Sequence, residues 1–120
     1  MKRILGIEDT EDNRQIVGDL LSSAGYELIE AVDGLEGVAT AEREQPDLIL
    51  MDIQLPGIDG YEATRRIRKI PALAKVPIIA VTSYALSGDE AKTREAGCDG
   101  YVAKPFSPRQ LLAKVREFLP

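Results

Sequence analysis

The sequence contains no histidine among its 120 residues. This absence excludes Ser-His-Asp and Cys-His catalytic arrangements, together with every metal site that depends on imidazole ligands. The chain also cannot carry a phosphohistidine of its own. Any chemistry must therefore come from carboxylates, hydroxyls, amides or amines.

Cysteine and long apolar runs are also scarce. Cys98 is the only cysteine, so an internal disulfide is excluded, and this fits a reducing compartment. It is expected to be a small buried residue. The apolar run after Met1-Lys2-Arg3 is too short for a signal peptide, and no run approaches membrane-spanning length. We therefore expect a cytoplasmic protein that does not associate with membranes.

Basic residues are fewer than acidic ones. The chain has 15 lysines and arginines and 20 aspartates and glutamates, which give a net charge of −5. Nucleic acid is not expected as a partner, because a phosphate backbone requires a basic surface. The length of 120 residues, with 44% hydrophobic and 29% charged residues, is typical of one soluble globular domain.

Short apolar runs alternate with longer segments of helical pattern. The apolar runs are residues 3–7, 27–32, 48–51, 77–81 and 101–103. Such an alternation predicts an α/β fold, in which a five-stranded parallel sheet carries helices on both faces. We expect the flavodoxin-like strand order 2-1-3-4-5. No repeat, linker or second domain is indicated.

The helical segments have recognisable ends and apolar stripes. One stripe is closed by Gly25 and consists of Ile16, Val17, Leu20, Leu21 and Ala24. A C-terminal stripe consists of Leu111, Leu112, Val115, Phe118 and Leu119. Helix starts are predicted by the pairs Asp33 with Glu36, Asp59 with Glu62, Ser87 with Glu90, and Ser107 with Gln110. The segment 87–96 is the most polar, so we expect it to pack least tightly.

Polar residues follow four of the predicted strands. Glu8 and Asp9 follow the first strand, Asp52 the third, Thr82 the fourth and Lys104 the fifth. Each has an ordinary structural explanation when taken alone, as a helix-start residue, a strand-end hydroxyl or a surface charge. In a parallel sheet, however, these positions meet in one crevice beyond the carboxyl ends of the strands.

Three carboxylates in a small space repel one another unless a cation is present. Oxygen ligands suit Mg²⁺, so Asp9 and Asp52, with Glu8 nearby, are predicted to hold this ion. Lys104 and Thr82 would contact an anionic phosphoryl group. Asp52 is central among these groups and is the best candidate to attack phosphorus and become an aspartyl phosphate.

Four motifs covering most of the chain resemble those of the receiver domains of two-component response regulators. They are ILGIEDTEDN, PDLILMDIQLPGIDGYE, PIIAVTSYA and AGCDGYVAKPF, in the family's order and spacing. The whole set is specific, whereas any one motif alone would be weak. Because the chain ends at the fifth predicted helix, it resembles stand-alone receivers such as the DivK kind. We expect one receiver domain, residues 1–120, and no output domain.

The resemblance implies that Asp52 accepts a phosphoryl group from a phosphohistidine on a sensor histidine kinase or a histidine phosphotransfer protein. It implies a Mg²⁺ site, with Mn²⁺ as an alternative, formed by Glu8, Asp9, Asp52 and the backbone carbonyl of Gln54. The protein would act in phosphorelay signalling and not as an enzyme, with only slow gain and loss of the phosphoryl group by itself.

The resemblance also implies a switch. Thr82 and Lys104 would contact the phosphoryl oxygens, and Tyr101 would swing inward as Thr82 moves, changing the face of the fourth helix, fifth strand and fifth helix. That face would control a downstream protein, and phosphorylation-dependent dimerisation is left open. Gln54 and Tyr84 would tune dephosphorylation. The Lys104-Pro105 bond is expected to be cis.

The residues implied to dock the phosphodonor are Asn13, Val17, Pro105 and Phe106. For Val17, ordinary core packing is an equal alternative. The sequence departs from the family at Gly6, which replaces a bulky aliphatic residue. Glycine inside a strand suggests a bulge or a close neighbour, and no function is assigned to it. Ser83 replaces a small alanine beside Thr82, and activity is expected to survive this change.

Three other functions fit the same residues less well. A haloacid dehalogenase-like phosphohydrolase needs a second acid two residues after the nucleophile, where this chain has Gln54. A flavodoxin-like FMN carrier needs a phosphate loop after the first strand, where the acids would repel phosphate. A pseudo-receiver used only for interactions would normally lack Asp52, Thr82 or Lys104.

Overall fold

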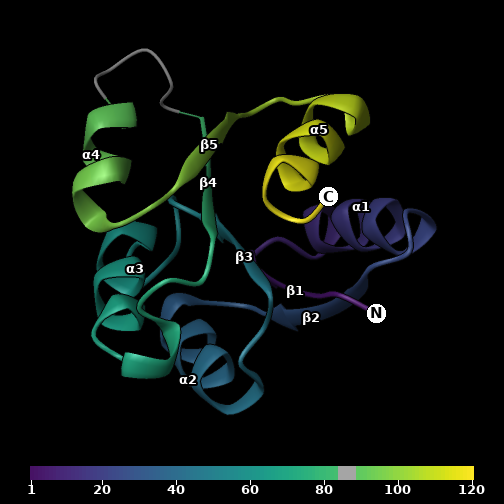
Figure 1. Cartoon of the computed structure of the whole chain (residues 1–120). Helices are drawn as coiled ribbons and strands as arrows, with labels where there is room; N and C mark the ends of the chain where they lie inside the picture. The colour runs from purple at the N-terminus through teal and green to yellow at the C-terminus, as the bar shows by residue number, and fades with distance from the viewer. Residues whose placement is uncertain (84–88) are drawn as a thin grey trace.

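The computed structural model describes residues 1–83 and 89–120 of the chain. Five parallel strands form one sheet in the order β2-β1-β3-β4-β5, as the sequence predicts (Figure 1). The strands are β1 (Arg3–Ile7), β2 (Glu27–Ala31), β3 (Leu48–Asp52), β4 (Ile78–Thr82) and β5 (Gly100–Ala103). The helices are α1 (Glu11–Ser23), α2 (Gly34–Glu44), α3 (Gly60–Arg68), α4 (Asp89–Ala96) and α5 (Pro108–Phe118), and Pro71–Leu73 forms a short 3₁₀ helix.

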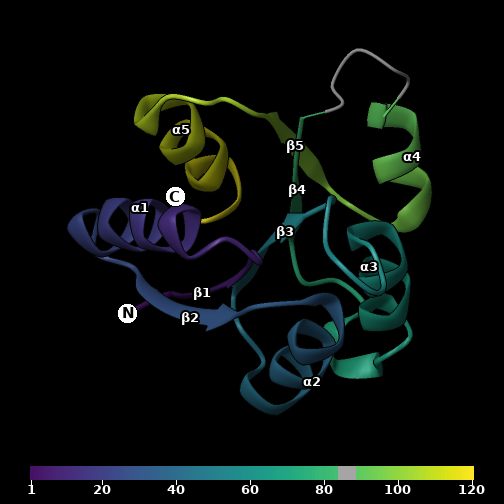
Figure 2. The same ribbon diagram turned by 180° about the vertical axis from the view of Figure 1, so that it is seen from behind.

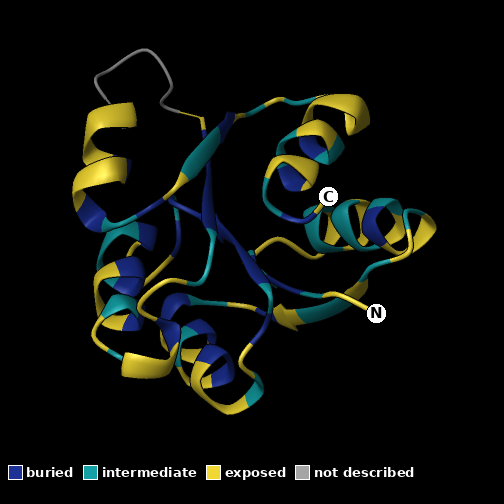
Figure 3. Cartoon of the chain, in the orientation of Figure 1, coloured by how far each residue is buried: buried dark blue, intermediate teal, exposed yellow. Residues whose placement is uncertain are grey.

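Helices cover both faces of the sheet. Figures 1 and 2 show α1 and α5 on one face and α2, α3 and α4 on the other. Each face has its own hydrophobic cluster, because alternate residues of a strand point to opposite sides. In β3 all five residues are buried, as expected for a central parallel strand with helices on both sides (Figure 3). The site residues at the ends of β1, β3 and β5 are therefore held by a rigid layer.

The predicted helix starts are formed by side-chain caps. Asp33 accepts a hydrogen bond from the backbone N–H of Glu36, and Asp59 accepts one from the N–H of Glu62. At α5 the capping box is complete, because Ser107 and Gln110 each accept a hydrogen bond from the other's backbone N–H. The predicted cap at Ser87 lies outside the described residues. Each of these caps joins residues only three positions apart, so the helix starts can be recognised from the local sequence.

The described part of the polar segment, helix α4, buries few side chains. Within residues 90–96 only Thr93 and Ala96 are buried. The sequence predicts that residues 87–96 pack least tightly, but residues 87 and 88 lie outside the described part of the chain. No described helix combines the length and the apolar character needed to cross a membrane.

Two sequence predictions are corrected by the packing. Ile16 was expected in the buried stripe of α1, but its side chain is 58% exposed. The stripe is narrower than expected because α1 rests mainly on Leu21, Val17 and Leu20, which belong to the cluster under α1 and α5. Gly6 was expected to mark a bulge or a close neighbour, yet the register of β1 runs through it continuously to β2 and β3.

Candidate functional site

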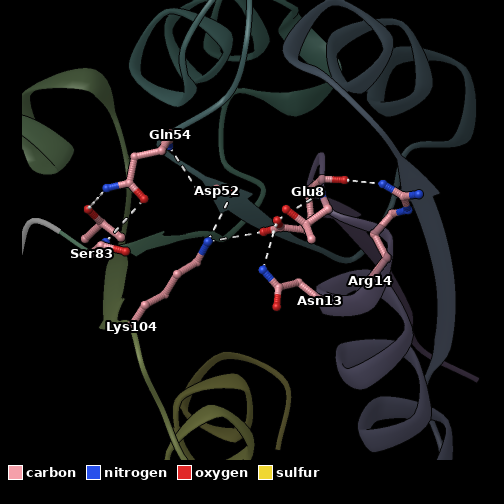
Figure 4. A network of polar contacts seen from close by, with 9 residues as sticks. Glu8, Asn13, Arg14, Asp52, Gln54, Ser83 and Lys104 are labelled. Atoms are coloured by element: carbon pink, nitrogen blue, oxygen red, sulfur yellow. Dashed lines mark hydrogen bonds and ion pairs between the residues drawn. The ribbon is translucent and has the colours of Figure 1, made fainter.

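The carboxyl ends of β1, β3 and β5 bring three charged side chains together (Figure 4). Asp52 is the last residue of β3, Glu8 follows β1 and Lys104 follows β5. Asp52 is only 3% exposed. A carboxylate buried to this degree requires partners that compensate for its loss of water.

Lys104 supplies that compensation for both acids. Its Nζ lies 3.2 Å from Asp52 Oδ2 and 3.3 Å from Glu8 Oε2. The ammonium group thus bridges two carboxylates at the ends of the neighbouring strands β1 and β3, while Lys104 itself follows β5 on the far side of β4. The bridge joins residues that are far apart in the sequence, so it depends on the strand order.

The acidic pair does not titrate like two ordinary carboxyls. Burial and the adjoining Glu8 carboxylate raise the pKa of Asp52 to about 7. Burial also acts to raise the pKa of Glu8, but its hydrogen bond with Asp52 and the charge of Lys104 hold that pKa below its ordinary value. Asp52 is therefore the member of the pair that retains a proton near neutral pH, and a bound cation would favour its release.

The same residues fit a divalent cation. Carboxylate oxygens of Glu8, Asp9 and Asp52 all lie within 4.8 Å of one another. Ligands on opposite sides of an octahedral Mg²⁺ are about 4.2 Å apart, twice the metal–oxygen distance. The spacing of the three oxygens is close to this limit, and oxygen is the donor that Mg²⁺ prefers. The three acidic residues among the predicted metal ligands are thus brought together.

Two residues of α1 hold Glu8 in place. Asn13 Nδ2 donates to Glu8 Oε1 at 3.3 Å, and Arg14 Nη1 donates to the backbone oxygen of Glu8 at 2.9 Å (Figure 4). The Arg14 guanidinium also pairs with Glu30 at 3.4 Å. From the sequence, Asn13 was predicted only as a docking residue, and a role for Arg14 was not predicted. Their position in the first turn of α1, five and six residues after Glu8, was the available signal.

Gln54 connects the acceptor strand to the end of β4. Its backbone N–H donates to Asp52 Oδ1 at 3.0 Å. Its side-chain amide donates to Thr82 Oγ1 at 3.4 Å and accepts from the Ser83 N–H at 3.4 Å (Figure 4). Thr82 is fully buried, whereas Ser83 is exposed. The sequence predicts that the Thr82 hydroxyl faces the crevice. In the structure this hydroxyl lies against the Gln54 side chain.

The remaining predicted residues are distributed around this centre. Tyr101 is half-buried against the cluster that α2 and α3 cover, and the Lys104–Pro105 bond is cis, as predicted. Cys98 is buried, also as predicted. Tyr84 lies outside the described residues.

The four predicted docking residues line one pocket. Its volume is about 540 Å³, and it opens between α1 and α5 next to Asp52. Pro105 is exposed, while Asn13, Val17 and Phe106 are partly buried. Phe106 packs on the cluster under α1 and α5, so it is not the fully exposed aromatic that would by itself require a partner.

Comparison with known sequences identifies relatives along nearly the whole chain. A sequence model of the response regulator receiver domain matches residues 4–116. The polar-differentiation response regulator DivK of Brucella anthropi is 40% identical over 118 residues, covering 98% of this chain and 96% of the relative. The DivK protein of Brucella ovis matches with the same identity and coverage.

Solved structures show the same fold. The receiver domain of the sensor histidine kinase PA1611 from Pseudomonas aeruginosa is 41% identical, with a TM-score of 0.92 over 98% of this chain and 97% of that one. That structure is described with a magnesium ion coordinated in its active-site cleft. The chemotaxis protein CheY4 of Vibrio cholerae is 30% identical, with a TM-score of 0.94 over 98% of both chains.

Proposed function

Because this chain belongs to the response regulator receiver family of two-component signalling, we propose that Asp52 accepts a phosphoryl group from a phosphohistidine on a partner protein. The observation that carries the proposal is the environment of Asp52. Its carboxylate is almost wholly buried at the end of the central strand, contacts Lys104, and adjoins a pocket open to solvent. An aspartate with only a structural role would not require an open pocket beside its carboxylate.

The residues have distinct tasks in this reaction. Glu8, Asp9, Asp52 and the backbone carbonyl of Gln54 would hold Mg²⁺, or Mn²⁺ in its place. When bound, the cation supplies positive charge that draws the phosphoryl oxygens toward an acidic site. Lys104 turns from the two carboxylates toward a phosphoryl oxygen, and Asn13 and Arg14 keep Glu8 in position. Asp52, freed of its proton, attacks phosphorus.

Turnover is expected to be slow, so the protein acts as a signalling acceptor and not as a phosphatase. Position 54 offers an amide where a hydrolytic enzyme would place a general acid or base. The Gln54 side chain lies beside Thr82 and Ser83, where it would restrict the approach of water. Tyr84 is proposed to share this role on the basis of the family resemblance alone.

The signal passes from Asp52 to the surface through Thr82. Because Gln54 contacts the Thr82 hydroxyl, movement of Thr82 toward a phosphoryl group requires this contact to break. Tyr101 would follow and change the face of α4, β5 and α5, which would bind a downstream protein or a second copy. A sensor histidine kinase or phosphotransfer protein would dock on Asn13, Val17, Pro105 and Phe106, in the cytoplasm.

Incubation with acetyl phosphate and Mg²⁺, followed by intact mass measurement, tests the proposal. We expect one added phosphoryl group, which is lost with EDTA and in Asp52→Asn. Asp19→Asn is the matched control, because Asp19 is an exposed aspartate on α1 away from the site, and it should be phosphorylated normally.

Two results would contradict the proposal. A folded wild-type protein that gains no phosphoryl group at saturating acetyl phosphate would exclude Asp52 as an acceptor for small donors. Retention of the adduct in Asp52→Asn would place it on another residue. Rapid release of free phosphate would instead favour an enzyme.

A further inference from the structure

Gly6 opens the floor of the pocket beside Asp52. It lies in β1 between Glu30 of β2 and Leu50 of β3, and it lines the pocket. A Cβ atom placed on Gly6 would meet only Leu28 Cδ1, at an ordinary contact distance of 3.6 Å. Neither crowding nor a positive φ therefore requires glycine here. The absence of a side chain at Gly6 leaves space in the pocket, which a larger residue would fill.

The pocket is amphipathic. Apolar side chains form its walls, namely Val17, Leu28, Leu50, Phe106 and Leu111. Charged side chains also line it, namely Lys104 and Arg14 together with the acids Glu8, Glu30 and Asp52. A volume of about 540 Å³ is within the range of small-molecule sites, roughly 300–1,000 Å³, and is larger than one side chain needs. With a divalent cation held by Glu8, Asp9 and Asp52, the arrangement would suit a short hydrocarbon chain that ends in an anionic group.

Building on the proposed phosphoacceptor function, we propose that this pocket binds the hydrocarbon chain of short-chain acyl phosphates and selects them over acetyl phosphate as phosphodonors. The anionic phosphoryl group would face Lys104 at the rim, which supplies charge complementarity. The acyl chain would lie between α1 and α5 and extend toward Gly6. Glu8 and Gly6 are two residues apart along β1, roughly 7 Å, a length that about five or six carbon atoms span.

The alternation of strand residues supports this orientation. Leu48 and Leu50 of β3 belong to the cluster under α1 and α5, so Asp52, two residues further on, points to the same face. In an in-line displacement the leaving group lies opposite the attacking oxygen. The acyl group would therefore leave on the side of the sheet that α1 and α5 cover, where a flexible chain can turn between the two helices toward Gly6.

The transfer is balanced without another reactant. One oxygen of the ionised Asp52 carboxylate bonds to phosphorus as the bond between phosphorus and the acyl oxygen breaks. The electron pair of that bond leaves with the acyl carboxylate, so the products are an aspartyl phosphate and a free carboxylate. No proton is taken up and no oxidation occurs.

Donor preference tests the proposal. Second-order phosphorylation rates are measured by intact mass for acetyl, butyryl and hexanoyl phosphate in Mg²⁺ at constant ionic strength. Each fully buried methylene group raises the binding constant about fourfold. If the acyl chain stays bound in the transition state, the same factor raises kcat/KM. With the chain about half buried, hexanoyl phosphate should react at least about tenfold faster than acetyl phosphate.

Two variants locate the effect. Gly6→Val, or the smaller Gly6→Ala if folding is impaired, fills the floor and should bring the hexanoyl-to-acetyl ratio toward one. Ala39→Val is the control, because Ala39 is exposed on α2, which covers the opposite face of the sheet, and it does not line this pocket. It should keep the wild-type ratio.

Binding of an inert analogue separates this proposal from the phosphoacceptor function. Hexylphosphonate, which cannot transfer a phosphoryl group, should in the presence of Mg²⁺ shift the amide NMR signals of Gly6, Val17 and Leu28 in the wild type and not in Gly6→Val. Equal rates for all three donors, or a ratio that survives Gly6→Val, would overturn the proposal. If acetyl phosphate fails to react, the phosphoacceptor function fails, and the phosphonate shifts alone decide whether the pocket takes an alkyl chain.

Discussion

Replacing Asp52 with asparagine should stabilise the metal-free protein at pH 8, although it removes the proposed acceptor. The side chain is 3% exposed, and its pKa rises from an ordinary 3.8 to about 7. Each pKa unit corresponds to about 1.4 kcal/mol, so ionising this carboxyl in the folded state costs up to about 4 kcal/mol. Glu8 offsets part of this cost, because its pKa moves in the opposite direction. We expect Asp52→Asn to gain about 2 kcal/mol.

The pH dependence follows from the direction of the shift. Between pH 4 and 7 the folded protein keeps the Asp52 proton, whereas the unfolded chain has released it. Fewer protons bind to the unfolded state, so wild-type stability falls as pH rises through this interval and then levels off. In Asp52→Asn this contribution is absent. The two proteins should therefore be nearly equally stable at pH 4 and diverge up to pH 7.

Urea denaturation followed by circular dichroism at pH 4, 6 and 8, with EDTA present, measures this difference. Asp19→Asn removes the same charge from an exposed position and should change stability by less than about 0.5 kcal/mol. Saturating Mg²⁺ should stabilise the wild type more than Asp52→Asn and reduce the gap. If Asp52→Asn were equally or less stable than the wild type at pH 8 without metal, the reasoning about this buried carboxyl would be wrong.

Three further variants address the site and its support. Lys104→Gln removes the ammonium group that bridges the acids, so the initial phosphorylation rate with acetyl phosphate should fall at least about tenfold. Gly60→Ala places a methyl against the carbonyl oxygen of Asp52 and should cost about 1–3 kcal/mol in urea denaturation. Arg68→Met deprives three backbone carbonyls and the Asp99 carboxylate of a donor, and thermal unfolding should show a loss of about 2–3 kcal/mol. An unchanged phosphorylation rate or unchanged stability would refute each prediction in turn.

Much of the site was predictable because strand ends are local features. A buried apolar run followed by Asp52, or by Glu8 and Asp9, can be recognised from neighbouring residues alone. The rule that parallel strands meet at one edge then predicts that these acids converge, and they do. Helix starts such as Ser107 were predictable for the same reason, since a cap depends on residues three positions apart.

Other features depended on how segments far apart in the sequence pack against each other, which the sequence pattern does not show. Ile16 shares the apolar pattern of its helix, but the angle at which α1 rests on the sheet leaves it exposed. Gln54 looked like a turnover residue, yet its contact with Thr82 depends on how the ends of β3 and β4 lie side by side. A periodic pattern indicates which residues are apolar, but it does not show how wide the buried stripe is.

The sequence by itself determined the five βα units, the helix caps and the set of acids, lysine and threonine that follow the strands. These are consequences of local propensity and of the strand period, which neighbouring residues specify. Only the tertiary structure decided that Lys104 bridges Glu8 and Asp52, and that the pKa of Asp52 rises to about 7. It also decided that Gly6 is the floor of a pocket and not a bulge. Burial and charge spacing depend on which strands become neighbours, and that order arises only when the whole sheet is assembled.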